Sequence, residues 1–193
     1  MNFYNKHSRK LQEQFDSVRL ADQLEKTRKH SRLTAEDRAV IENAAFFFIA
    51  TADANGRPDC SIKGGNPGFV KCASDTKIVF RNYDGNGMFR SLGNIKCNPW
   101  IGLLFIEFGD EPKKLRINGC ASFDYEDAGN PTEIIITVAI KDIFPNCPRY
   151  LPDVQITGRS VYNPAPGYAP PDPLWKSKPD LEPFLPKPTP KAR

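Results

Sequence analysis

The chain has 193 residues and a mass of 21.7 kDa, a size that fits one domain with appended segments better than two domains. A hydrophobic content of 39% and 13 phenylalanines exclude a chain that is disordered throughout. The formal net charge of +4 is mild and no long block of Lys or Arg is present, which argues against nucleic-acid binding and suits a small anionic ligand.

The cysteines and histidines argue against two common kinds of site. Five cysteines are an odd number and form no Cys-x-x-Cys pair, so a disulfide framework and a structural zinc site are not expected. His7 and His30 lie outside the expected core segments, so we expect no metal site. The longest apolar runs are about half of a membrane span, and the residues after Met1 do not resemble a signal peptide. We therefore expect a cytoplasmic protein without a membrane partner.

Helices are predicted in residues 1–44. From about residue 7 to residue 28, apolar side chains recur every three or four positions, which predicts one amphipathic helix lying on the domain or on a partner. A second helix is predicted to start at Thr34, whose side chain can cap the first turn, and to end near Asn43. We expect this helical segment to pack on the domain that follows.

The pattern changes to that of strands at residue 45. Residues 46–51 are rich in aromatic and β-branched side chains and are followed by the turn signal Asp53-Ala54-Asn55-Gly56. Further strands are predicted around residues 59–63, 68–72, 77–82, 100–108, 114–123 and 132–140. Many short strands in close succession predict an antiparallel barrel or sandwich, to which we assign residues 45–162. A helix-sized segment, residues 88–96, interrupts the strands.

Residues 163–193 carry ten of the 18 prolines, which favour an extended chain. Two interpretations are open: a disordered tail, or an extended arm that docks on the domain or on the neighbouring subunit. The spacing of Tyr168, Trp175 and Phe184 favours the arm, with each aromatic ring buried in a groove.

Three glycine-containing segments carry polar or cationic side chains. In Ser61-Ile62-Lys63-Gly64, the glycine lets backbone N–H groups approach a flat ligand beside an ammonium. Arg81 and Asn82 end a strand and can donate to a polar ring edge or to phosphate. Arg90 and Ser91 begin the helix, where free N–H groups and the helix dipole favour an anion. Each segment alone fits an ordinary turn or surface; together they favour a phosphorylated planar cofactor.

The same segments resemble the pyridoxamine 5′-phosphate oxidase-related FMN-binding proteins. The similarity lies in residues 61–65, in residues 85–94 and in residues 98–105. Residues 115–121 resemble a later barrel strand of the family, and residues 144–150 resemble a segment found in one branch. The resemblance implies an FMN-binding split β-barrel, mostly β with peripheral helices (α+β), that forms a homodimer with FMN sites at the subunit interface.

The resemblance also implies a set of cofactor-binding residues. They are Ser61, Ile62, Lys63, Gly64, Arg81, Asn82, Asn86, Met88, Arg90, Ser91 and Arg149. The oxidase itself usually has Lys where this chain has Ser91, so the phosphate would carry less compensating charge unless Lys63 or Arg149 supplies it. The oxidase's substrate-recognising pattern of Arg and His is not found in the proline-rich tail, so vitamin B6 oxidation is not expected.

The expected function is that of an FMN-dependent oxidoreductase acting on an unidentified small molecule. No residue is assigned a catalytic role, because the flavin ring itself carries the redox chemistry. Two alternatives remain open: a non-catalytic flavin-binding or flavin-handling protein, and a deazaflavin-dependent reductase of the same fold. Haem is disfavoured because both histidines lie outside the expected barrel.

Overall fold

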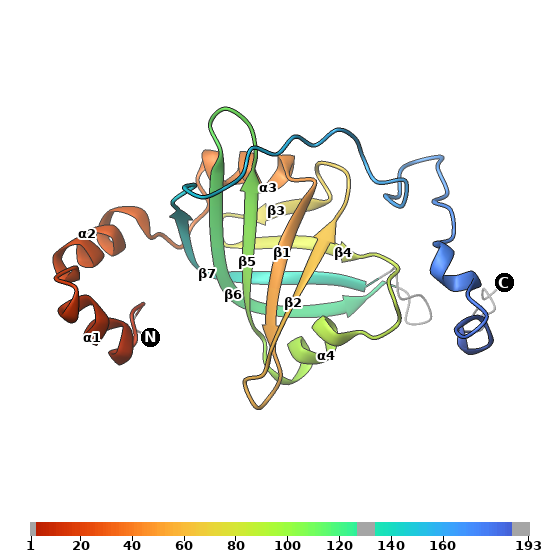
Figure 1. Ribbon diagram of the computed structural model, residues 1–193, viewed down its shortest axis with the longest axis horizontal. Helices are drawn as coiled ribbons and strands as arrows, with labels where there is room; N and C mark the ends of the chain where they lie inside the picture. The colour runs from red at the N-terminus through yellow and green to blue at the C-terminus, as the bar shows by residue number, and fades with distance from the viewer. Residues whose placement is uncertain (1–2, 127–133, 187–193) are drawn as a thin grey trace.

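The computed structural model describes residues 3–126 and 134–186, in which seven strands form one antiparallel sheet (Figure 1). The strands are β1 (Phe46–Ala52), β2 (Pro58–Gly64), β3 (Val70–Ser74), β4 (Lys77–Asn82), β5 (Trp100–Glu107), β6 (Lys113–Tyr125) and β7 (Ile134–Asn146). The helices are α1 (Lys6–Gln14), α2 (Val18–Arg28), α3 (Ala35–Asn43) and α4 (Arg90–Cys97). The last strand of the barrel, β7, ends at Asn146.

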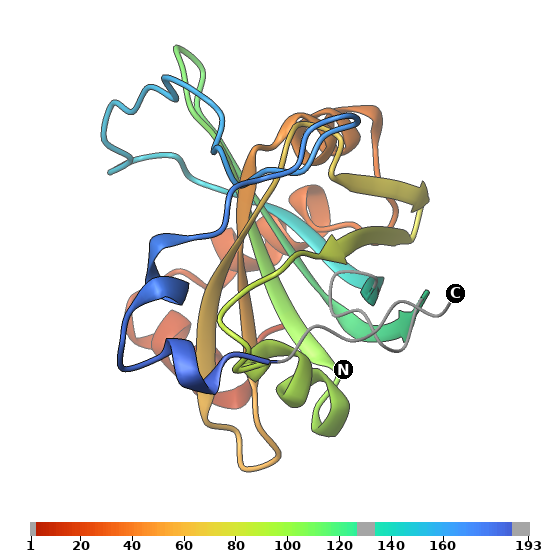
Figure 2. The ribbon, with the colours of Figure 1, turned by 90° about the vertical axis from the view of Figure 1, so that its right-hand side faces the viewer.

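The sheet curls into a barrel that is open along one seam. Its strand order is β2-β1-β5-β6-β7-β4-β3, so β2 and β3 are the two edges and do not hydrogen-bond to each other within the described ranges. The split β-barrel expected from the sequence is therefore confirmed. The segment between β4 and α4 runs along the side of the barrel on which β2 lies (Figure 2).

The barrel core follows from the alternation of side chains along the strands. In β1, Phe47, Ile49 and Thr51 are buried, whereas Phe46 and Phe48 face the other side of the sheet. The ring of Phe47 lies at the centre of an aromatic cluster. Its centroid is 5.8 Å from that of Phe69, 5.0 Å from that of Phe80 and 5.0 Å from that of Phe105.

The N-terminal segment contains two helices where the sequence predicted one, so that prediction was wrong. α1 ends in a Schellman-type turn: Ser17 N–H donates to the carbonyl of Gln12, and Asp16 takes a left-handed φ of 51°. Glycine is usual at that position, which is why the sequence does not signal the break. α3 contacts β3, β5 and β6, whereas α1 and α2 project as a hairpin (Figure 1).

α3 begins where Thr34 predicted. The Thr34 hydroxyl accepts the backbone N–H of Asp37, and the Asp37 carboxylate accepts the backbone N–H of Thr34 at 2.8 Å. This reciprocal capping box satisfies two donors that a helix start leaves without a partner.

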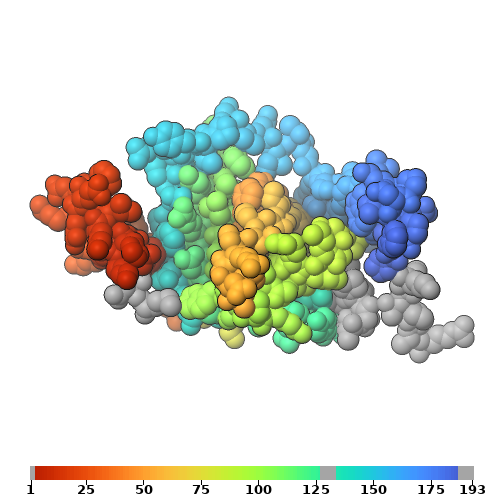
Figure 3. Space-filling model, turned by 60° about the horizontal axis from the view of Figure 1, so that its bottom comes forward, coloured from red at the N-terminus to blue at the C-terminus, as the bar shows by residue number. Residues whose placement is uncertain are grey.

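The C-terminal segment crosses the end of the barrel and then extends away from it, opposite the N-terminal helices (Figures 1 and 3). As far as residue 186 it is irregular, with several turns and two short 3₁₀ helices, η2 (Leu174–Ser177) and η3 (Glu182–Phe184). In the single chain Tyr168 and Phe184 are 47% and 82% exposed, so neither ring is buried against its own domain, and docking on a neighbouring subunit stays a prediction. Among the described residues, no helix is both long and apolar enough to cross a membrane.

Candidate functional site

The candidate site lies at the seam of the barrel, beside β2. In the antiparallel pairing of β1 and β2, Phe47 is opposite Lys63 and Ile49 is opposite Ser61. Directly paired residues share a face of the sheet, so Ser61 and Lys63 lie on the same face as the buried core residues. Ile62 lies on the opposite face and is 57% exposed. Two of the predicted β2 residues thus border the seam from inside, and Ile62 does not.

Lys63 is the one cation of the site that has no salt bridge among residues 3–126 and 134–186. Its side chain is half-buried, and this burial holds the pKa of its ammonium below the usual value, with the carboxylate of Asp59 acting in the opposite direction. A desolvated cation without an ion-pair partner is costly, so an anion bound here would stabilise the charged form.

Arg90 and Ser91 lie where the sequence placed them, in the first turn of α4. Arg90 Nε donates to Asp59 Oδ1 of β2 at 3.1 Å, which joins the helix start to the strand that carries Lys63. Ser91 is buried. The residue before the helix, Phe89, has a left-handed φ of 50° and provides no side-chain cap, so no side chain at the cap position accepts the first N–H groups of α4.

A hydrogen bond fixes the position of α4 on the barrel. Asn94 Nδ2 donates to Thr51 Oγ1 of β1 at 2.9 Å. Leu92 and Ile95, on the same helix, are buried in the core. α4 is therefore held by both apolar and polar contacts, and the positions of Arg90 and Ser91 follow from that anchoring.

Arg81 and Asn82 end β4, on the other side of the seam. Asn82 is buried, and Arg81 Nη2 lies 2.8 Å from the Glu126 carboxylate. Beyond them, the loop of residues 83–89 leads to α4. In it, Asn86 Oδ1 accepts the backbone N–H of Met88 at 3.0 Å, and the Met88 side chain is 62% exposed. Asn86 thus shapes the loop, and Arg81 already has a carboxylate partner.

Arg149 lies at the opposite end of β7 from Arg81 and Asn82. Asn82 pairs with Ile134 at the start of β7, whereas Arg149 follows the far end of that strand. A strand of this length spans about 40 Å. Arg149 Nε instead donates to Cys147 Sγ at 3.2 Å, and hydrogen bonds from Arg149 lower the pKa of that thiol. Its proposed compensation of the phosphate charge therefore gains no support within a single chain.

Asp59 is the site residue that sequence reasoning missed. It precedes Ser61 by two positions and therefore lies on the same face of β2 as Ser61 and Lys63, so the strand period could have identified it. The two histidines lie away from the site: His7 is exposed on α1, and His30 Nε2 contacts Asp37 Oδ2 at 2.8 Å. In the part of the chain that the structure describes, no group of three metal-binding side chains occurs.

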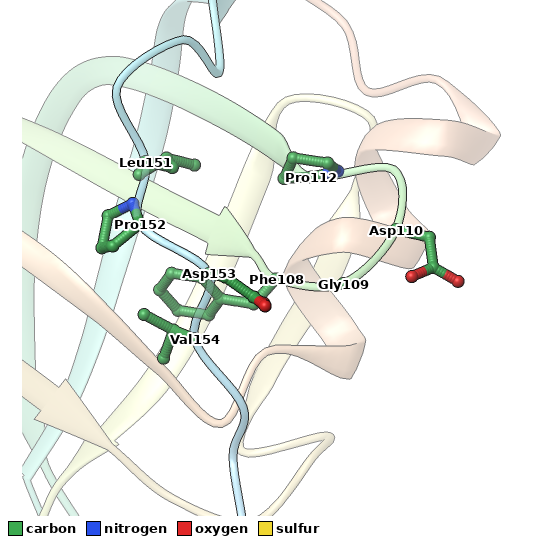
Figure 4. Close-up of a pocket in the computed structure, with 8 residues that line it drawn as sticks. All are labelled: Phe108, Gly109, Asp110, Pro112, Leu151, Pro152, Asp153 and Val154. Carbon is green, nitrogen blue, oxygen red and sulfur yellow. The ribbon is translucent and has the colours of Figure 1, made fainter.

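One concave surface of the chain lies away from this site. A cavity of about 330 Å³ lies between the β5–β6 turn and the C-terminal segment (Figure 4). Its residues are Phe108, Gly109, Asp110, Pro112, Leu151, Pro152, Asp153 and Val154. Its only charged residues are acidic, so it does not suit a phosphate. The cations and donors at the seam are the better candidate for an anionic ligand.

The family model described as Pyridoxamine 5′-phosphate oxidase matches residues 33–163. The chain belongs to this family. The matched region begins before α3 and includes every strand of the barrel. It also includes all the predicted cofactor-binding residues, from β2 to the segment after β7. The family membership predicted from the sequence motifs is therefore confirmed.

Similar solved structures share a remote likeness with the chain. HupZ from Group A Streptococcus is 22% identical, with 58% of this chain and 93% of that chain covered and a TM-score of 0.46. The heme storage protein HutZ from Vibrio cholerae is 15% identical, with 59% of this chain and 95% of that chain covered and a TM-score of 0.43. An FMN-binding protein from Syntrophomonas wolfei subsp. wolfei is 13% identical, with 71% of this chain and 95% of that chain covered and a TM-score of 0.43. No curated protein matches the chain.

Proposed function

We propose that the chain binds FMN at the seam of the barrel, beside β2 and the end of β4, and uses it for hydride or electron transfer to or from a small molecule. The observation that carries the proposal is the half-buried ammonium of Lys63, which has no salt bridge in the described ranges and lies on the strand joined by Asp59 to Arg90. A buried charge of this kind is stabilised by a bound counter-ion. Membership of the pyridoxamine 5′-phosphate oxidase family supports a flavin as the bearer of that anion.

The residues present fit FMN by their chemistry. Arg90 and Ser91 provide a guanidinium, a hydroxyl and the N–H groups of a helix start for the phosphate. Ser61 and Asn82 provide neutral hydrogen-bonding groups for the ribityl chain or the ring edge, and Lys63 provides a positive charge. Bound FMN supplies hydride and electron chemistry, so the chain needs no nucleophile of its own. Its residues bind, orient and neutralise the cofactor.

The proposed assembly is a homodimer with the cofactor sites at the subunit interface. Large apolar side chains are exposed on β2 and on the segment before α4: Ile62, Met88 and Phe89. Such a group of exposed apolar residues is typical of an interaction surface. We expect light scattering at micromolar concentration to give the mass of a dimer. A monomer that carries a full complement of FMN would contradict a shared site.

The absorption spectrum of the purified protein, before and after addition of FMN, tests the proposed function directly. Flavin bands and saturable binding are expected. Oxidation of NADH or NADPH by the FMN-bound protein would distinguish an enzyme from a non-catalytic flavin-binding protein. A deazaflavin or a haem would each give a different spectrum, so either alternative would be recognised in the same measurement.

Lys63→Met should weaken FMN binding, because it removes a positive charge that has no salt bridge among residues 3–126 and 134–186. Since burial lowers the pKa of Lys63, its ammonium loses its proton below the ordinary value of 10.5. FMN affinity should therefore fall as the pH rises toward 10.5, and this alkaline fall should be smaller in Lys63→Met. Lys71→Met, which changes an exposed lysine on β3, is the matched control and should leave the pH profile unchanged. Identical alkaline profiles in Lys63→Met and the unmodified protein would remove Lys63 from the site.

A further inference from the structure

The C-terminal segment lies against both loops of the candidate site. We call residues 151–178 the strap; they run from the end of β7 across the barrel toward the loop of residues 83–89 (Figures 1 and 2). The strap is held at three places, of which two are polar contacts to loops that adjoin predicted cofactor-binding residues. The two polar contacts join residues that are more than 90 positions apart in the sequence, so they depend on the fold and not on local chain geometry.

The first contact is apolar and loose. Val154 and Ile156 border, together with Phe46 and Phe108, a cavity of about 270 Å³ between the strap and the β5–β6 hairpin. Val154 is 36% exposed and Ile156 is 54% exposed, so neither side chain is fully buried against the barrel. Because little apolar surface is removed from water here, this contact alone does not fix the strap.

The second contact is with the loop that follows β2. Asn66 Nδ2 donates to the carbonyl of Pro164 at 3.2 Å, and Asn163 Nδ2 donates to Asn66 Oδ1 at 3.3 Å. Asn66 therefore both donates to and accepts from the strap. It lies three residues after Lys63, so the strap is attached directly beside the strand that carries the ammonium of the site.

The third contact is with the loop that connects β4 to α4. Lys176 Nζ lies 2.7 Å from Asp84 Oδ2 and 3.3 Å from Asp172 Oδ1 of the strap itself. The side chain of Lys176 is only 26% exposed. Asp84 lies between Asn82 and Arg90, so this ion pair holds the loop whose two ends carry predicted cofactor-binding residues. Asp172 holds the ammonium in place from within the strap.

We propose that the strap is a latch on the candidate cofactor site, closed by the Lys176–Asp84 ion pair, which slows the release of the bound cofactor. The attachment of the strap is inferred from its contacts with Asn66 and Asp84. The slowed release of cofactor rests in addition on the proposed FMN site. With the strap attached, the loops on both sides of the seam are tied to one segment. With the ion pair broken, the strap remains attached only through Asn66 and the loose apolar contact. The loop of residues 83–89 then opens more often.

Two measurements test the latch, one without flavin and one with it. Trp175 lies next to Lys176 and is half-buried. In a Trp100→Phe background it is the only tryptophan, so acrylamide quenching of its fluorescence reports strap attachment in the flavin-free protein. The second measurement is the rate at which FMN dissociates after dilution into excess apo-flavodoxin-type scavenger or after competition with a second flavin. The variants are Lys176→Met, Asp84→Asn and both together, with Lys178→Met, an exposed lysine directly after the same turn, as the matched control.

Lys176→Met and Asp84→Asn should each raise the quenching of Trp175 and speed FMN dissociation by roughly twofold to fivefold, the range for an ion pair at the surface. The double variant should be no faster than either single one, because both remove the same interaction. Lys178→Met should change neither quantity. High salt should reduce the difference between the variants and the unmodified protein.

The contrary results separate the two proposals. Unchanged Trp175 quenching in Lys176→Met would overturn the latch, whatever the flavin result. If quenching increased in Lys176→Met while the FMN dissociation rate stayed unchanged, the ion pair would attach the strap without retaining the cofactor. That result also overturns the latch. If the unmodified protein bound no FMN, the proposed function and the role in cofactor release would both fail, and the quenching data would still decide whether the ion pair attaches the strap.

Discussion

Phe47→Ala should lower the free energy of unfolding by about 3–5 kcal/mol, the range for removing a buried aromatic ring. Phe47 is fully buried, and its ring contacts those of Phe69, Phe80 and Phe105. These residues come from β1, β4, β5 and the loop before β3, so the cavity left by alanine would lie where the strands meet. The loss of apolar burial and the uncompensated cavity both contribute. Urea unfolding at a fixed protein concentration measures the change.

Phe184→Ala is the matched control, because it removes the same side chain from a position that is 82% exposed. A change within about 0.5 kcal/mol is expected there. If Phe47→Ala does not fold, Phe47→Leu keeps most of the volume and should still be destabilised by a measurable amount. Equal stability of Phe47→Ala and Phe184→Ala would mean that the aromatic cluster is not the core of the fold.

The barrel could be predicted from the sequence where local patterns and packing agree. Residues 77–82 were predicted as a strand and form β4 with the same bounds, since alternating apolar side chains there face a buried core. The Thr34 cap was likewise predicted, because the capping box is a local interaction. β7 was predicted to end at Ile140 but continues to Asn146, through Lys141 and Asp142. Its pairing with β6 satisfies the backbone there although the side chains are polar.

The sequence motifs pointed to individual residues of the candidate site, but they did not predict the contacts between those residues. The grouping of Lys63 with Arg90 rests on motifs, and the structure joins them through Asp59. The separation of Arg149 from Arg81 and Asn82 depends on the full length of β7, which no local pattern reports. Asp84 and Lys176 are 92 residues apart in the chain, and each is an ordinary surface charge in the sequence. Only the fold shows that they form a pair.

Arg90→Ala should weaken FMN binding by about 1.5–3 kcal/mol, the range for hydrogen bonds to charged groups. This corresponds to roughly a tenfold to 150-fold increase in Kd. Riboflavin, which lacks the phosphate, should lose far less affinity, because the proposed role of the Arg90 guanidinium at the start of α4 is to bind that phosphate. Fluorescence titration of both flavins against the two proteins measures the difference.

A second variant separates phosphate binding from a structural role of the same side chain. Arg90 donates to Asp59 at 3.1 Å, so alanine at residue 90 also removes the link between α4 and β2. Asp59→Asn weakens that link but leaves the guanidinium in place and removes a carboxylate that would repel the phosphate. FMN affinity should therefore be unchanged or higher in Asp59→Asn, and strongly reduced in Arg90→Ala. If the two variants lost FMN and riboflavin affinity to the same extent, Arg90 would act by holding β2 and not by binding phosphate.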